Sequence, residues 1–480
     1  MEMNQKPTTA ELTAKEVCVA PLVSNVLEDA KEDPMSHKNN YVTSVLMLTN
    51  SKIGINVLIM PKLFHLSGTL LGTLQLVLIA AISFKTSLML CSVGNAFGMK
   101  SYFEICDHYF KGNNRYFIHI LFLGLILGNI LCFQAFVLQC FIRLVQELYF
   151  AGKIVSLTQM TLMKIIVCLI VNLFILPFVF IRKAKFVNLL ANVCTIGMLV
   201  GILVIFGAYL FPALRSNSST QDHVDPVKYV DFNGLYASIG VYMMSFCFHL
   251  AIVDVNAGIY PKTQRSTNIV VISNCLSSLS LYFIVSVFGY LATSDRYNDG
   301  HSTSNYFIDL ILSNQQNSSL LFAASFVTIV AVILGNVNNY LAFIRFLNWK
   351  LNKTSDLLSS KLLENLSLGF SFVKNEPTNE EYDANYTRVY NSIVLGTYLI
   401  IISATLFITL FDVRIEMIFD FFAATCASPV CIIIPSYLYL HILDSGYIAE
   451  AKQSQWVIAY CMIGIGIVLW VFSIFAAYEA

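Results

Sequence analysis

Residues 48–61 read LTNSKIGINVLIMP, and this stretch decides how the rest of the chain is interpreted. It is apolar enough to enter a bilayer, yet two asparagines, a serine, a lysine and a glycine interrupt its middle. Backbone at membrane depth must hydrogen-bond to itself unless it lines a cavity inside the protein. The pattern therefore predicts a membrane helix that is broken beside an internal cavity.

A second stretch of the same character, SFCFHLAIVDVNAG, occupies residues 245–258. It carries a histidine, an aspartate, an asparagine and a glycine among apolar residues. Polar interruptions at corresponding positions of two halves are typical of the binding site of a secondary transporter. The alternative is a pair of kinked packing helices whose polar groups reach toward the membrane surface.

The composition around these stretches is that of a membrane-embedded chain. Of its 480 residues 57% are hydrophobic and only 12% are charged, against roughly 25% charged residues in soluble domains. The 29 basic and 29 acidic residues cancel, which excludes a polybasic nucleic-acid binder. Long apolar runs, each near the ~20 residues that a membrane helix needs, indicate an all-α integral membrane protein with the lipid bilayer as its partner. Eleven transmembrane helices are predicted, at 42–61, 68–92, 116–142, 160–180, 188–211, 235–255, 269–292, 320–343, 391–411, 417–440 and 456–478.

The two interrupted spans are the first of two five-helix halves. The predicted organisation is a polar tail at 1–41, five-helix repeats at 42–211 and 235–441, and an eleventh helix with the carboxyl terminus at 456–480. Nineteen of the 29 Lys and Arg residues lie in segments that face inward if the tail is cytosolic, and cytosolic loops are enriched in these residues. The tail is therefore expected in the cytosol. The Asn217-Ser-Ser sequon then falls in an outer loop and predicts a glycoprotein.

Four motifs resemble the amino acid/auxin permease family, most closely its sodium-coupled neutral amino-acid transporters. The first span matches the family pattern Asn-x-x-x-Gly-x-Gly-x-Leu at Asn50, Gly54 and Leu58, with Asn56 in place of the second glycine. Residues 246–249 (Phe-Cys-Phe-His) are similar to the family's sixth span. Further similar motifs are Phe-Gly-Tyr-Leu at 288–291, followed by Asp295, and Ile-Pro-Ser-Tyr at 434–437.

The resemblance implies a LeuT-type 5+5 inverted repeat with helices one and six broken. It also implies a secondary active transporter of amino acids that works by alternating access. For the substrate, the unwound backbone of span one offers N–H groups and span six offers free carbonyls and an imidazole. The expected substrate-binding residues are Gly54, Ile55, Asn56, Ser245, Phe246 and His249. Asn56 places a side chain where the family has room, which bears on substrate size.

A second set of residues is predicted to take part in ion coupling. The coupling ion is either H⁺ or Na⁺, and the sequence does not decide between them. This set is Asn50, Lys52, Asp254, Ser325 and Thr328. Asn50 resembles the family's sodium-linked asparagine, and Ser325 and Thr328 share a helix face that would supply its partner hydroxyl. A Na⁺ site at Asn50 and Thr328 is thus one expectation. No other metal site and no cofactor is expected, since the sequence has no C-x-x-C pair or metal motif.

Lys52 departs from the family, which has an apolar residue there. A lysine in mid-span costs ~2.5–3.5 kcal/mol or more and should be paired or functional. One hypothesis pairs it with Asp254 and lets its ammonium replace a coupling cation, which makes transport proton-coupled or uncoupled. The other places Lys52 near the inner surface, where its amine snorkels into water. His249 leaves two similar alternatives, a group that titrates and gates transport, or a neutral hydrogen-bonded core histidine.

Two other functional classes compete with transport. An amino-acid sensor, or transceptor, could use the same fold and signal through its cytosolic tail. An enzyme is not expected, because no H-E-x-x-H, G-x-S-x-G or P-loop motif occurs. The plasma membrane and a vacuolar or lysosomal membrane both fit the sequence, and the oligomeric state is not predicted.

Overall fold

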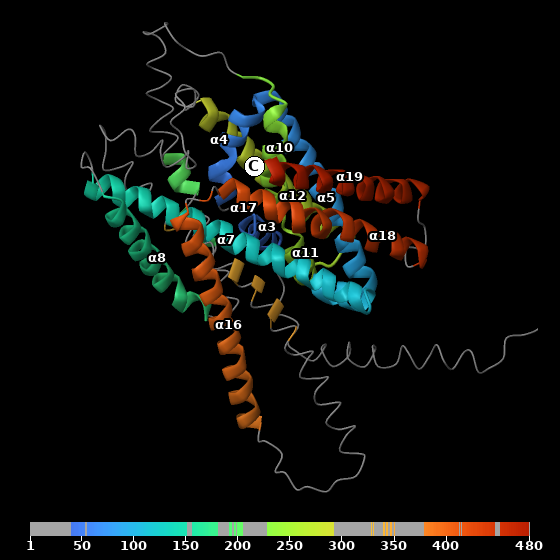
Figure 1. Cartoon of the computed structure of the whole chain (residues 1–480). Helices are drawn as coiled ribbons and strands as arrows, with labels where there is room; N and C mark the ends of the chain where they lie inside the picture. Colours follow the sequence, from blue (N-terminus) through green and yellow to red (C-terminus); the bar gives the residue numbers. More distant parts are fainter. Residues whose placement is uncertain are drawn as a thin grey trace, which may run out of the picture.

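A computed structural model of the chain describes residues 40–52, 55–150, 156–180, 228–291, 379–411, 415–446 and 452–479, with Val413 and scattered positions in 192–204 and 328–350. These residues are almost entirely helical (Figure 1). The helices are α3 (Tyr41–Asn50), α4 (Ile55–Ser67), α5 (Thr69–Phe97), α6 (Tyr102–Tyr109), α7 (Asn113–Phe150), α8 (Leu157–Val179), α10 (Asn233–Ser245), α11 (His249–Gly258), α12 (Gln264–Leu291), α16 (Asn379–Leu410), α17 (Ile415–Phe422), the π-helical η3 (Ala423–Ala427) and η4 (Pro429–Ile433), α18 (Ile434–Asp444) and α19 (Gln453–Glu479).

Eight helical stretches within the described residues are long and apolar enough to cross a membrane. They coincide with predicted spans two, three, four, six, seven, nine, ten and eleven. Predicted span one is divided between α3, of 10 residues, and α4, of 13. The tail, most of spans five and eight, and the Asn217 sequon lie outside the described residues. An all-helical membrane protein is thereby confirmed.

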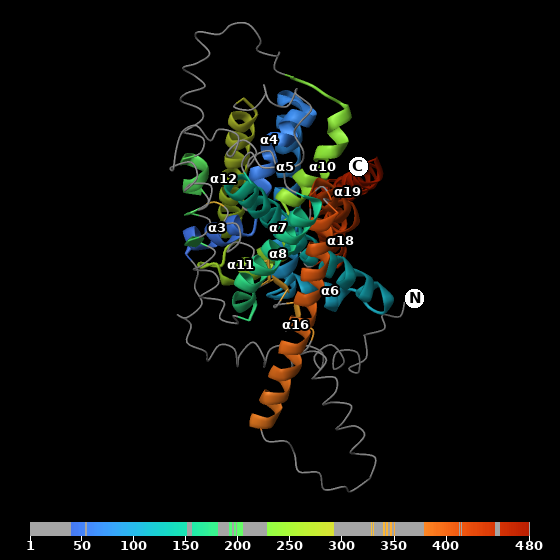
Figure 2. The ribbon, with the colours of Figure 1, turned by 60° about the vertical axis from the view of Figure 1, so that its left-hand side comes forward.

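The helices pack in two groups. One group contains α3, α4, α5, α10, α11 and α12, with α12 packed against α3, α4 and α5. In the other group α7, α8 and α16 contact one another, and Figures 1 and 2 show α8 and α16 running side by side at the edge. The segment from α17 to α19 joins the groups through contacts with α7 and α10.

Burial separates central helices from peripheral ones. In the stretch 238–258, 78% of the most apolar window is buried inside the protein, whereas in 453–475 only 22% is. Lipid-facing helices keep their outer side chains exposed in the isolated chain, because the bilayer would cover them. The interrupted sixth span is therefore central, and α19 is peripheral.

Both predicted interruptions coincide with helix ends. Asn40 caps α3 by accepting a hydrogen bond from the Tyr41 amide (2.7 Å), and the helix stops at Asn50. Ser51 and Lys52 form a turn before α4 starts at Ile55. Here this interruption is called break one. The second, break two, comprises residues 246–248 between α10 and α11.

Three elements differ from the sequence prediction. The short helix α6 occupies the loop between spans two and three, where none was expected. Span ten, predicted as one helix at 417–440, passes through two π-helical segments on either side of Ser428, next to Pro429, which has no N–H to donate to the helix. Finally, α16 begins at Asn379, twelve positions before the predicted span at 391.

Candidate functional site

Break one buries a lysine. The Lys52 side chain is 2% exposed. Its Nζ lies 3.7 Å from the centre of the Phe248 ring and 5.7 Å from that of Phe246. Nζ also approaches Cys275 Sγ on α12 at 4.0 Å. A cation over an aromatic face is attracted by the ring quadrupole, most strongly where water is excluded. The lysine of break one therefore rests on the aromatic side chains of break two.

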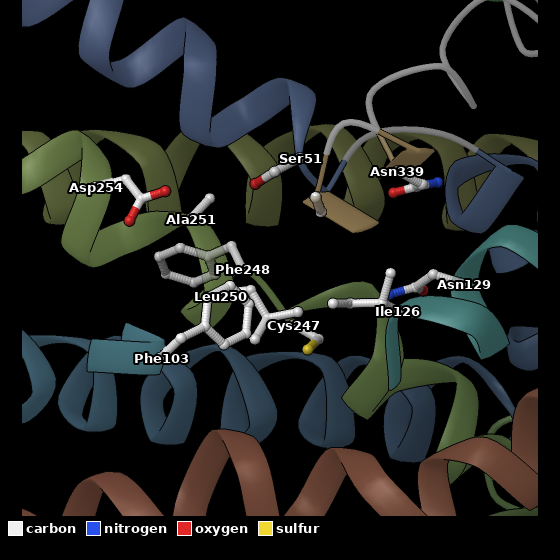
Figure 3. Close-up of a pocket in the computed structure, with 11 residues that line it drawn as sticks. Ser51, Phe103, Ile126, Asn129, Cys247, Phe248, Leu250, Ala251, Asp254 and Asn339 are labelled. Atoms are coloured by element: carbon white, nitrogen blue, oxygen red, sulfur yellow. The ribbon is translucent and has the colours of Figure 1, made fainter. Parts of the chain in front are cut away.

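This geometry corrects the two placements predicted for the Lys52 amine, while its role in coupling stays a prediction. The amine does not snorkel, because it is enclosed by protein. It also forms no ion pair with Asp254: among the described residues its close neighbours are the two rings and the thiol. The physical reason lies in the turn at Ser51 and Lys52, which directs the lysine toward break two and α12. Asp254 instead faces the cavity shown in Figure 3.

The carbonyls at break two, those of Ser245 at the end of α10 and of Phe246 within the break, are not free, which corrects a second expectation. The Tyr282 hydroxyl on α12 lies 3.1 Å from the Ser245 carbonyl oxygen. The Ser83 hydroxyl on α5 donates to the Phe246 carbonyl at 2.8 Å. Carbonyls released by a helix break cannot stay unsatisfied in a low-dielectric interior. Neighbouring hydroxyls occupy them in this conformation.

The Tyr282 hydroxyl also reaches break one. It lies 3.0 Å from the Lys52 carbonyl oxygen, so a single hydroxyl stands between the two breaks. The Asn56 amide nitrogen lies 3.5 Å from that same carbonyl, which places Asn56 back against the break. The Tyr282 ring meets the Phe246 ring edge to face, with 5.3 Å between their centres. Sequence reasoning missed Tyr282, since a tyrosine in an apolar span carries no local signal of such a role.

His249 begins α11 and is fully buried. Its Nε2 lies 2.9 Å from Thr86 Oγ1 and 3.2 Å from Ser87 Oγ, both on α5. Hydroxyls can donate to or accept from a neutral imidazole, so these contacts suit the hydrogen-bonded core histidine. Its Nδ1 has no hydrogen-bond partner among the described residues.

A cavity lies beside both breaks, and Figure 3 shows side chains converging on it. Its enclosed space is about 70 Å³, well below the roughly 300–1,000 Å³ of typical small-molecule sites, so the cavity is narrow in this conformation. Polar groups are few and apolar side chains form most of its wall. Its lining is Ser51 from break one, Cys247 and Phe248 from break two, Leu250, Ala251 and Asp254 from α11, Phe103 from α6, Ile126 and Asn129 from α7, and Asn339 and Ala342.

The predicted site residues are distributed unevenly around this cavity. Asp254 lines it, while the described side chains of Asn56, Ser245, Phe246 and His249 are buried outside its lining. Gly54 and Ser325, and the side chains of Asn50 and Ile55, lie outside the described residues. Thr328 is buried at 2% exposure. The Na⁺ site at Asn50 and Thr328 therefore stays a prediction.

Several lining residues had no sequence signal of their own. Ser51, Cys247 and Phe248 sit inside the quoted motifs and were adjacent to the predicted positions. Phe103 enters from the unpredicted α6, whose Tyr102 hydroxyl donates to the Val430 carbonyl at 2.8 Å and so anchors α6 to η4. No group of three His, Cys, Asp or Glu side chains able to hold a metal occurs in the described part of the chain.

Comparison with known proteins supplies the class of molecule. Residues 37–479 match the family described as transmembrane amino acid transporter protein. The chain belongs to this family. The match extends across both breaks and every described helix, and it confirms the resemblance found in the motifs.

The chain is also similar to a curated mouse (Mus musculus) protein, solute carrier family 38 member 10. The two are 19% identical over 252 residues, which is 52% of this chain. The chain spans about a fifth of the relative's length, since the matched region is 22% of it. The matched family and this relative are both transporters by description, so the chain is a transporter-family protein and not an enzyme.

Proposed function

We propose that this protein is a secondary active transporter that carries amino acids across a membrane by alternating access. The observation that carries the proposal is the cavity beside two helix breaks, lined by Ser51 from one and by Cys247 and Phe248 from the other. A site between two interrupted helices can open to either side when those helices move against the rest. Family membership supplies the substrate class.

The proposed architecture has eleven transmembrane helices in a LeuT-type 5+5 inverted repeat. Its support is the grouping of helices by position in the predicted halves. Spans one and two pack with six and seven, whereas three and four pack with nine. Hydroxyl donors cross between the halves in the same way. Span seven supplies Tyr282 to break one, and span two supplies Ser83 to break two.

The chemistry of the cavity lining suits an amino acid. Ser51 and the amides of Asn129 and Asn339 offer hydrogen bonds to a carboxylate or to an ammonium group, and Asp254 offers a negative charge. Phe103, Phe248 and Leu250 offer an apolar surface to a side chain. The predicted residues Gly54, Ile55 and Asn56 are proposed to meet the carboxylate, where α4 begins at Ile55 and its dipole would face the negative charge.

For coupling, we propose that the Lys52 ammonium occupies the place of a coupling cation. Its support is the burial of the amine at the junction of the two breaks, against Phe248. Transport would then be proton-coupled or uncoupled. Symport with Na⁺ bound at Asn50 and Thr328 is the competing proposal, and the two predict opposite responses to sodium.

The proposed orientation places the amino terminus in the cytosol of a plasma, vacuolar or lysosomal membrane. Its support is the inward excess of basic residues. The Asn217 sequon would then lie on the outer side and carry a glycan. A protease-protection assay on sealed vesicles, with a tag at each terminus, tests this orientation.

Uptake by purified protein in proteoliposomes tests the function. Twenty radiolabelled amino acids are offered with and without a sodium gradient and at pH 5.5 and 7.5, with empty liposomes as the control. We expect saturable uptake of at least one amino acid, independent of sodium. Sodium-dependent uptake would overturn the lysine proposal and favour the Na⁺ site. Saturable binding without flux would replace the transporter by the sensor.

A further inference from the structure

Tyr282 occupies a position that the transport proposal does not explain. Its side chain is fully buried on α12, and its hydroxyl faces the carbonyls of Lys52 and Ser245 at 3.0 and 3.1 Å. A hydroxyl has one hydrogen to donate. Two carbonyls at the helix breaks therefore share one hydroxyl hydrogen, and the Lys52 carbonyl has a second, longer contact from the Asn56 amide at 3.5 Å.

The Ser83 hydroxyl, which also reaches a break from a neighbouring helix, contacts one break only. Ser83 donates to the Phe246 carbonyl and so serves break two alone. Tyr282 is thus the described side chain whose hydroxyl contacts backbone of both breaks. If the breaks separate, the shared hydrogen must remain with one of them. The Ser245 carbonyl would then require a new donor, whereas the Lys52 carbonyl would keep only the longer contact from Asn56. Hydrogen bonding to the Tyr282 hydroxyl thus connects the two breaks without a covalent bond.

We propose that the Tyr282 hydroxyl is a positioning group that holds the two breaks together and is displaced when a substrate ammonium binds one of the two carbonyls. The positioning role rests on geometry alone. The displacement by substrate rests on the proposed function. An ammonium brings three donors, so its arrival releases the tyrosine to satisfy the other carbonyl fully. The hydroxyl thus takes the place at the carbonyls that the substrate ammonium would occupy.

The positioning role is tested by hydrogen–deuterium exchange on the full chain in detergent. Tyr282→Phe keeps the ring that packs on Phe246 and removes only the donor. Peptides covering 49–52 and 245–249 should both exchange about threefold to tenfold faster, the size of one net hydrogen bond. Ser83→Ala should accelerate only the peptide of break two. Ser286→Ala is the matched control, because that buried hydroxyl, one turn along α12, bonds the Tyr282 carbonyl of its own helix. It should accelerate neither peptide.

Two results of this exchange experiment would contradict the positioning role of Tyr282. Acceleration in only one break, or exchange equal to that of Ser286→Ala, overturns the positioning role. If Tyr282→Phe does not fold, 4-aminophenylalanine at position 282 restores a donor at the ring terminus. Recovery of folded protein with wild-type exchange in both peptides then supports the role, and failure to recover overturns it.

The displacement clause has its own readout. In proteoliposomes Tyr282→Phe should lower KM about threefold to tenfold, because substrate no longer competes with the hydroxyl. Vmax should fall as well, because no internal donor returns to help release the substrate. Transport with both parameters unchanged overturns the displacement clause and leaves the proposed function intact. If the wild-type protein carries no amino acid, the proposed function and this clause fail together, whereas the exchange result still decides the positioning role.

Discussion

Break one and break two receive polar contacts from the opposite half of the chain, yet they contain different chemistry. Thr49 at the end of α3 donates to Asn274 on α12 (3.2 Å), just as His249 at the start of α11 meets Thr86 on α5 (2.9 Å). Break one adds a buried cation, Lys52, whereas break two adds the aromatic rings that receive it. The breaks are thus similar in their supports and complementary in their contents. Two breaks with identical side chains could not form this contact between a cation and aromatic rings.

The strongest way to disturb this complementarity is Lys52→Met, which keeps the length of the side chain and removes its charge. We expect uptake to fall about 30-fold, because a desolvated cation–aromatic contact is worth about 2 kcal/mol. Thermal stability in detergent should stay equal or rise, since apolar replacement of a buried charge is often neutral or stabilising. Lys100→Met, at an exposed lysine, is the control. Unchanged uptake with unchanged sodium response would contradict the assigned role of the lysine.

The aromatic side of the contact is tested by Phe248→Leu. Loss of the ring nearest to the Lys52 ammonium should weaken substrate binding about fivefold, corresponding to roughly 1 kcal/mol. The leucine side chain should keep the cavity wall apolar at this position. The measurement is KM in proteoliposomes. Phe407→Leu on α16, whose ring is 57% exposed, provides the control. A KM equal to that of the control would show that the contact has no part in binding.

His249→Gln separates the two interpretations of the histidine. Because the described contacts of Nε2 are the hydroxyls of Thr86 and Ser87, we expect a structural role. The free energy of unfolding should fall by about 1 kcal/mol, and the pH profile of uptake between 5.5 and 7.5 should keep its shape. A flattened profile in the variant would instead establish His249 as a titrating gate.

The smallest expected effect is that of Thr49→Val, which removes the contact between α3 and Asn274. Hydrogen bonds between membrane helices average about 0.6 kcal/mol, so unfolding should require slightly less denaturant and uptake should change less than twofold. Thr397→Val is a matched control, because its hydroxyl bonds the Ile393 carbonyl of its own helix. A larger loss of uptake than that of His249→Gln would mean that break one depends on α12 more than break two depends on α5.

The positions of the breaks could be predicted because polar residues are costly inside an apolar span and concentrate where the helix lines a cavity. The short helix α6 was missed although Ser101 and Glu104 form a Ser-x-x-Glu start signal. In the structure Glu104 accepts from the Lys100 amide at 3.2 Å, one residue earlier than a capping box requires. The irregular course of span ten was also signalled, by Pro429, but a proline within a span does not indicate whether the helix kinks or widens.

The partners of the site residues could not be predicted. Lys52 and Asp254 were paired because opposite charges at membrane depth are expected to meet. The turn after α3 instead directs the amine to Phe248 and Phe246, and Asp254 faces the cavity. Likewise, the carbonyls of Ser245 and Phe246 were expected to be free, whereas hydroxyls on α12 and α5 fill them. A linear pattern records which groups need a partner and not which neighbour is nearest.

The sequence alone contains the hydropathy, the sites of polar interruption and the family motifs, because burial in lipid constrains the residue type at each position. They establish a helical membrane protein of the amino acid transporter family with two breaks near residues 50 and 246. The cavity, the cation resting on aromatic rings and the shared hydroxyl of Tyr282 depend on contacts between residues about 200 positions apart. Such contacts follow from how the helices pack, since packing selects one partner among many of equal chemical suitability.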